Sequence, residues 1–155
     1  MNKIYVDVTQ FHTQDGLGIF VEGYQPVLAG TSVSAMDLED YNGEYKRFAD
    51  EFDIHFIFED NIPQIDFYTV PMVEIFAKDS HGGYIGSLGE SVNLYKDIPI
   101  CYIDKNKQTY IIAKTGKEFL DDVSHWKDNF VLYEDIEIFD SLQAAKSQYN
   151  FLNIK

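Results

Sequence analysis

The stretch VEIFAKDSHGGYIGSL, residues 73–88, decides the fold of this chain. Its two ends, Val73–Ala77 and Tyr84–Leu88, contain the aromatic and β-branched residues that favour strands. The segment between them, Lys78–Gly83, ends in two glycines, which adopt the backbone angles of tight turns without steric cost. The stretch therefore predicts a β-hairpin with Gly82 and Gly83 at its bend.

Similar patterns on both sides of this hairpin predict more strands. They are expected at Ile4–Val8, Gly18–Tyr24, Ile54–Phe58, Ile100–Ile103, Thr109–Ala113 and around Ile136–Ile138. The turn Thr13–Gly16 would join the first two of these strands as a hairpin, and the turn Asp104–Lys107 would join another pair. Short strands joined by tight turns are typical of an antiparallel sheet.

A first helix is predicted between the second and third of these strands. Large apolar side chains recur at helical spacing at Leu38, Tyr41, Tyr45, Phe48 and Phe52. Thr31 or Ser34 is suited to cap the start of this helix. Glycine in a helix interior lowers helix stability by roughly 1 kcal/mol relative to alanine. Because Gly43 would lie inside a helix that begins this early, the alternative is a helix that begins as late as Asn42.

Two further helices are predicted in the last third of the chain. Thr115-x-x-Glu118 is a capping box for one of them, and Asp140-x-x-Gln143 can begin the other. Their apolar faces are Phe119, Val123, Trp126 and Phe130, and then Leu142, Ala145, Tyr149 and Leu152. Because hairpins outnumber strand–helix–strand units, we expect an α+β fold: a mainly antiparallel sheet with about three flanking helices, in a single domain over residues 1–155.

The composition indicates a globular protein of a reducing compartment. Of 155 residues, 45% are apolar, which is enough for a buried core. Cys101 is the only cysteine, so a disulfide within the chain is excluded. Asp7, Thr9 and Gln10 interrupt any apolar signal core near the start, and no apolar run approaches the roughly 20 residues that span a bilayer. A cytoplasmic location is expected.

The net charge of −14 is concentrated in two segments. Ser34–Asp60 holds nine acids and two bases, and Glu118–Asp140 holds eight acids and one base, so each carries −7 and the remainder is neutral. Such a surface repels nucleic acid and anionic membranes and attracts basic partners. The simpler interpretation is that the charge only keeps the protein soluble.

No residue pattern predicts catalysis or a cofactor. Gly82, Gly83, Gly86 and Gly89 do not have the spacing of a phosphate-binding loop. The run Asp79-Ser80-His81 contains catalytic residue types, but adjacent loop residues rarely form a triad. The four histidines are far apart and lack metal-ligand spacing, and Cys101 lies in an apolar strand. We therefore assign no catalytic, cofactor-binding or metal-binding residue and expect no enzyme activity.

The segment from about Val73 to Val123 resembles the SUKH superfamily. The similar motifs are the strand Val73–Ala77, the step Gly82–Ile85, the strand Ile98–Asp104, the strand Tyr110–Ala113 and the helix start Gly116–Leu120. They cover about a third of the chain. The first half departs from the family pattern, which opens with a helix rather than with strands.

This superfamily includes cell-wall regulators of yeast and many bacterial immunity proteins. The resemblance implies a non-catalytic domain that binds and neutralises a cognate toxin, often a nuclease. A nuclease binds the phosphates of its substrate in a basic cleft, and carboxylates of another protein can occupy that cleft. We therefore expect the acidic helices to bind the partner, through Asp37, Glu39, Asp40, Glu44, Asp50, Glu51, Asp121, Asp122 and Asp128.

Two alternatives remain open from the sequence. A regulatory or scaffold domain of the same superfamily would bind a different protein. A small-ligand-binding domain would use some of the 23 aromatic Phe and Tyr side chains to line a pocket.

Overall fold

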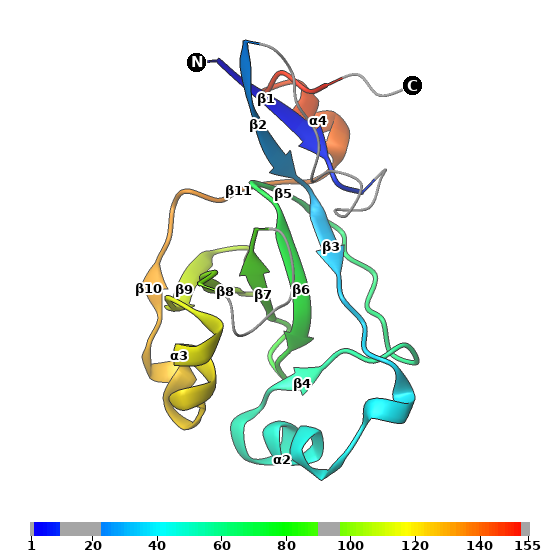
Figure 1. The fold of residues 1–155 in the computed structure, drawn as a ribbon, viewed down its shortest axis with the longest axis vertical. Coiled ribbons are helices and arrows are strands. Elements are labelled where there is room, and N and C mark those ends of the chain that lie inside the picture. Colours follow the sequence, from blue (N-terminus) through cyan, green and yellow to red (C-terminus); the bar gives the residue numbers. More distant parts are fainter. Residues whose placement is uncertain (1, 10–22, 90–96, 153–155) are drawn as a thin grey trace.

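The computed structural model describes residues 2–9, 23–89 and 97–152, and confirms the α+β fold with a mainly antiparallel sheet (Figure 1). Its centre is a seven-stranded sheet with the order β10-β9-β8-β7-β6-β3, in which β4 also pairs with β6. Among the described strand pairs of this seven-stranded sheet, only β3–β6 is parallel. The strands are β3 (Thr31–Val33), β4 (His55–Phe56), β6 (Val73–Lys78), β7 (Tyr84–Leu88), β8 (Ile100–Ile103), β9 (Thr109–Ala113) and β10 (Val131–Leu132).

The two hairpins expected around residues 73–113 form the middle of this sheet. Strands β6 and β7 pair antiparallel, as do β8 and β9. The turn after β8 is stabilised by Asp104, whose Oδ1 accepts the backbone N–H groups of Asn106 and Gln108 at 2.9 Å each. Local turn chemistry therefore sets the register of the central strands.

Two small two-stranded sheets lie beside the large one. In the first, β1 (Asn2–Asp7) pairs parallel with β2 (Tyr24–Ala29); in the second, β5 (Tyr68–Val70) pairs antiparallel with β11 (Glu137–Phe139). The strand β2 was not predicted because Pro26 reads as a strand breaker. Among the described residues, β2 pairs only with β1 and is an edge strand, a position at which proline is tolerated.

The predicted hairpin at the start of the chain is only partly visible. The turn Thr13–Gly16 and nearly all of the predicted strand Gly18–Tyr24 lie outside the described residues. In the described part, β1 has a parallel partner rather than a hairpin partner. Near the other end of the chain, the N–H of Tyr5 donates to Asn150 O at 2.9 Å and the N–H of Leu152 donates to Tyr5 O at 2.8 Å. Residues close to the two ends of the chain therefore lie side by side.

The small sheets continue into the large one at a corner made by Gly30 and Pro71. Gly30 links β2 to β3, and Pro71 links β5 to β6. The Gly30 N–H donates to Thr69 O at 2.8 Å, and the Val73 N–H donates to Gly30 O at 3.1 Å. Gly30 has φ +120°, and a Cβ there would lie 3.1 Å from Thr9 Cγ2 and 3.2 Å from Val8 Cγ2, so the corner favours glycine.

The first helix begins at the later of its two predicted starts, after Asn42. The chain has a 3₁₀ turn η1 (Leu38–Asp40), helix α2 (Gly43–Phe52), helix α3 (Gly116–Asp121), the 3₁₀ segment η2 (Val123–Asp128) and helix α4 (Leu142–Lys146). A cap at Thr31 or Ser34 is wrong, because Thr31 lies in β3 and Asn42 caps α2 by accepting the Glu44 N–H at 2.9 Å. Thr115 caps α3 as predicted, and Ser141, one residue after Asp140, caps α4.

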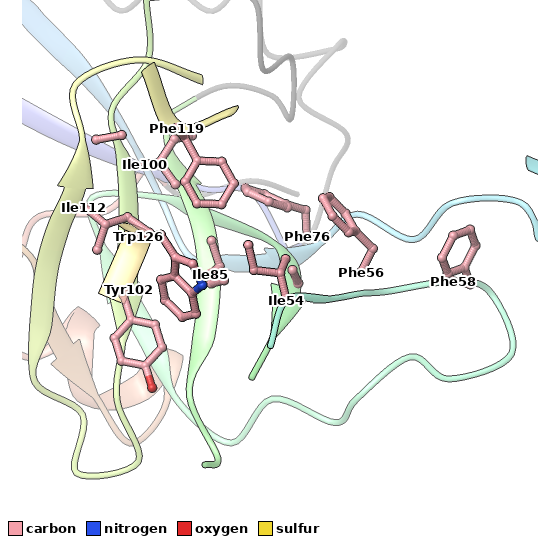
Figure 2. Packing of buried hydrophobic residues seen from close by; sticks show 12 residues of the cluster. Ile54, Phe56, Phe58, Phe76, Ile85, Ile100, Tyr102, Ile112, Phe119 and Trp126 are labelled. Carbon is pink, nitrogen blue, oxygen red and sulfur yellow. The ribbon is translucent and has the colours of Figure 1, made fainter. Parts of the chain in front are cut away.

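Two apolar clusters cover the large sheet. One lies under α2, α3 and η2 and contains a row of neighbouring rings, Phe119, Phe76 and Phe56, beside Trp126 (Figure 2). The other contains the buried Cys101. Trp126, predicted to lie in the core, is 2% exposed. Among the described residues, no helix is long and apolar enough to cross a membrane.

Candidate binding surface

Parts of the two acidic segments, α2 and η2, lie side by side at the end of the molecule remote from β1 and α4 (Figure 1). The indole Nε1 of Trp126 donates to the Phe52 carbonyl at 2.6 Å. Beside it, the Lys127 ammonium donates to Asp53 Oδ2 at 2.8 Å. These two contacts join the C-terminal end of α2 to η2.

The backbone at Asp53 makes this meeting possible. Asp53 ends α2 in the left-handed conformation, with φ 58°, and the Ile54 N–H turns back to the Phe48 carbonyl at 3.0 Å. Aspartate is one of the few residues besides glycine that tolerate this conformation. The reversal presents the Asp53 side chain to the loop after β6 and to η2.

Asp53 is the most highly bonded carboxylate of this surface. It accepts from the Ser80 hydroxyl at 2.8 Å, from the Ser80 N–H at 3.1 Å and from Lys127, and its Oδ1 lies 2.9 Å from His55 Nε2. Burial favours the neutral acid, but the bonds from Lys127, Ser80 and His55 outweigh it and hold the pKa of Asp53 well below its usual range. Asp53 is therefore ionised and structural.

A cleft of about 260 Å³ lies between the end of α2 and η2. Its acidic lining residues are Glu51, Asp53 and Asp128, and its basic ones are His125 and Lys127. Of the nine predicted partner-binding acids, the structure brings Glu51 and Asp128 together here.

The other predicted acids are spread over neighbouring elements. Asp37 precedes η1, which contains Glu39 and Asp40; Glu44 and Asp50 lie on α2; Asp121 ends α3, and Asp122 follows it. All of these side chains are exposed except that of Asp122, which is half-buried.

Several acids of the helices already have basic partners in the chain. Ion pairs one helical turn apart join Lys46 to Asp50, Arg47 to Glu44 and Glu51, and Lys117 to Asp121, and His125 Nδ1 lies 3.2 Å from Asp122 Oδ1. Hydrogen bonds from Asn129 and His125 also lower the pKa of Asp122. Exposed pairs such as these contribute little stability. They partly neutralise the helix faces.

Four of the predicted acids lack such a partner. Within residues 2–9, 23–89 and 97–152, no basic side chain is paired with Asp37, Glu39, Asp40 or Asp128. The first three surround the 3₁₀ turn η1. Uncompensated negative charge is therefore found at η1, more than along α2 or α3.

A second hollow, of about 430 Å³, lies between η1, α2 and the segment after β4. We call it the aromatic groove; its lining includes Leu38, Tyr41, Tyr45, Phe58 and Asp60. Leu38 is 45% and Tyr41 51% exposed, although both were predicted to share one helix face with Tyr45. That prediction is wrong because Tyr41 is extended, with ψ 133°, and breaks the helical spacing.

The hairpin loop after β6 is held by its own side chains. Asp79 Oδ1 accepts the N–H groups of His81 at 3.0 Å and Gly83 at 2.8 Å, and Asp79 Oδ2 accepts the Tyr102 hydroxyl at 2.5 Å. Gly82 has φ +85°, and a Cβ on Gly83 would lie 2.0 Å from the Tyr102 hydroxyl oxygen. Ser80 bonds to Asp53. The side chains of Asp79 and Ser80 therefore form hydrogen bonds that hold the loop in place.

Sequence reasoning missed the aromatic groove and the role of Asp53. The sequence signal for the groove was Asn42-Gly43, because Asn42 is a good helix cap. A helix that begins there leaves Leu38 and Tyr41 outside it. Asp53 had no comparable signal, because its partners Ser80 and Lys127 are 27 and 74 residues away.

The described residues offer no group of three or more His, Cys, Asp or Glu side chains that could hold a metal ion. Burial raises the pKa of the Cys101 thiol to about 12, so this cysteine is a packed side chain rather than a nucleophile.

Comparisons with protein-family models, with curated proteins and with solved structures find no match to this chain. Its function is therefore inferred from its residues and their geometry.

Proposed function

We propose that this chain is a non-catalytic protein-binding domain of the immunity type, which neutralises a basic bacterial toxin, such as a nuclease, in the cytoplasm of the producing cell. One observation carries the proposal: α2, from the first acidic segment, contacts η2, from the second, so that acids of both segments lie at one end of the molecule. They form an acidic end on a protein of net charge −14.

Charge of this kind suits the capture of a basic protein. Complementary fields raise association rates by factors of about 10–1,000 and discriminate against acidic partners. A toxin that binds phosphates presents lysine and arginine side chains in a cleft, and carboxylates on α2, η1 and η2 can block that cleft. The same field disfavours direct binding to nucleic acid or to an anionic membrane.

Two further points support a binding role. The resemblance of Val73–Val123 to the SUKH superfamily implies toxin neutralisation. The side chains of Asp79 and Ser80, the strongest catalytic candidates in the sequence, are engaged by Tyr102 and Asp53 in bonds that hold the loop.

A small-ligand-binding domain is the second candidate, and the aromatic groove favours it. Its volume of about 430 Å³ falls in the range of about 300–1,000 Å³ that is usual for ligand pockets. In that case the groove would bind a free small molecule.

The test begins with recovery of the partner. The chain is used to co-purify proteins from the native host, and the recovered protein is expressed alone to measure its toxicity with and without this chain. Association rates are then measured for the wild type and for a variant with Asp40, Glu44, Asp121 and Asp122 changed to lysine. We expect association at low salt to slow by about 10-fold or more, with the fold retained in circular dichroism.

The matched control makes the same change in charge elsewhere, at the exposed residues Asp66, Asp97, Asp135 and Asp140. It is expected to slow association much less. An acidic or non-toxic partner, or equal slowing in both variants, would contradict the proposal.

A further inference from the structure

The aromatic groove combines exposed rings with fixed geometry. The ring centroids of Tyr41 and Phe58 are 5.3 Å apart at 69°, and those of Tyr45 and Phe58 are 5.3 Å apart at 85°. Tyr41 stacks with Tyr45 at 6.4 Å. The three rings brace one another, yet half of Tyr41 remains open to solvent. An exposed aromatic face held in this way is ready to receive a ligand without reordering.

The charge around the groove is negative and largely uncompensated. Asp60 is part of the lining, which includes no lysine or arginine among the described residues; its histidine, His55, is hydrogen-bonded to Asp53. Leu38, on the groove wall, follows Asp37 and precedes Glu39 and Asp40 in the chain, and none of these acids has a basic partner within the described ranges. The carboxylate of Glu59 accepts the Leu38 N–H at 3.2 Å, which brings a further negative charge to this wall.

A site that combines aromatic rings with carboxylates suits an arginine better than any other side chain. Arginine carries a planar cation that stacks on aromatic faces and donates in a fork to a carboxylate, and its hydration is weaker than that of lysine. An apolar side chain would be satisfied by the rings but would leave the carboxylates without a partner. A lysine would gain the charge contact but stacks less well.

We propose that the aromatic groove receives an arginine side chain of a basic partner protein, against the ring of Tyr41 and beside the carboxylate of Asp60. The inference deepens the proposed function, on which it rests, by naming what the acidic end recognises. The α2–η2 contact would orient the partner, and the groove would hold one arginine as an anchor.

The test uses a peptide rather than the partner. Acetyl-Gly-Gly-Arg-Gly-Gly-amide is titrated into ¹⁵N-labelled protein and followed by NMR, beside peptides in which citrulline, lysine or norleucine replaces arginine. Citrulline has nearly the shape of arginine without its charge. We expect saturable shifts at Leu38, Tyr41, Tyr45 and Asp60 with the arginine peptide, and affinities at least about threefold lower for the other three peptides.

Matched variants locate the two halves of the site. Tyr41→Phe keeps the ring and is expected to bind normally, whereas Tyr41→Leu keeps apolar bulk but loses the ring and is expected to bind about threefold more weakly or worse. Asp60→Asn removes the charge and should weaken binding similarly. Asp135→Asn, at an exposed position between β10 and β11 and outside the groove lining, is the control and should bind normally.

Several results would overturn the inference. They are the absence of a saturable response, equal affinity for citrulline, lysine or norleucine, and equal loss in Asp135→Asn. Because the peptide needs no toxin, such a failure removes the groove assignment and leaves partner capture by the acidic helices untouched. Conversely, arginine binding without any basic toxin among the recovered partners would overturn the proposed function alone.

Discussion

The indole of Trp126 is joined to the backbone of Phe52 across 74 residues of sequence by a hydrogen bond of 2.6 Å. The acceptor is a carbonyl at the end of α2, where helices leave carbonyl groups without partners. Trp126 is also the only tryptophan of the chain and is almost fully buried. One side chain therefore both fills the core and completes the end of the helix.

Trp126→Phe should destabilise the protein by about 2 kcal/mol, because it leaves the Phe52 carbonyl without its donor and removes part of a buried ring. Urea unfolding followed by circular dichroism measures this loss. Hydrogen exchange should also become faster at the Ile54 amide, which closes the last turn of α2. A loss of stability without faster exchange at Ile54 would mean that the hydrogen bond does not hold the end of the helix.

Asp53→Asn should destabilise the protein near neutral pH and much less in acid. The pKa of Asp53 is lowered by folding, so the ionised group adds stability above its unfolded pKa of about 3.9, and this stability is lost as the pH falls below that value. Asparagine tolerates the left-handed conformation, so the comparison isolates the charge.

Urea unfolding from pH 7 to pH 2 measures the difference between wild type and Asp53→Asn. We expect a gap of about 2 kcal/mol at pH 7 that narrows below about pH 4. A gap that stays constant over this range would show that the ionisation of Asp53 does not contribute.

Gly83→Ala should cost about 3 kcal/mol, because the new methyl group would lie 2.0 Å from the Tyr102 hydroxyl oxygen and displace a buried ring. Gly82→Ala is the matched control. Its Cβ has space, and only its φ of +85° opposes the change, at about 1–2 kcal/mol. Thermal unfolding of both variants tests the order, and a larger loss for Gly82→Ala would contradict the close approach of Tyr102.

Cys101 should resist thiol reagents in the native protein. It is fully buried in the second apolar cluster, and burial raises its pKa to about 12, so almost no thiolate is present at pH 8. Labelling with a chromogenic disulfide reagent is expected to proceed only as fast as the protein unfolds. Addition of urea should make it immediate, whereas rapid labelling of the native protein would show that the strand β8 opens readily.

The hairpins could be predicted because their signals are local. In β6–β7 and β8–β9, the apolar strands and the turn residues between them lie within about 20 residues of sequence. The cap at Thr115 is local in the same way. These elements depend on neighbours in the chain, which sequence patterns report.

The parts that were not predicted depend on distant partners. The strand β2 contains a proline, and its pairing with β1 shows no local signal. The exposure of Tyr41 follows from an extended residue between η1 and α2, while the side-chain spacing alone still fits a helix. The aromatic groove exists because of that break, so the same residue explains both the wrong helix face and the missed site.

The pairing of Tyr5 with the segment Asn150–Leu152 has a practical consequence for binding measurements. Both of these segments lie at the end of the molecule remote from α2 and η2 (Figure 1). A linker or fusion partner joined close to β1 or to the segment Asn150–Leu152 therefore starts from the end of the molecule remote from the acidic end. If the protein is immobilised on a sensor through its N-terminal or its C-terminal side, it should present the same face to solution. The affinities measured with the two attachments should therefore be the same.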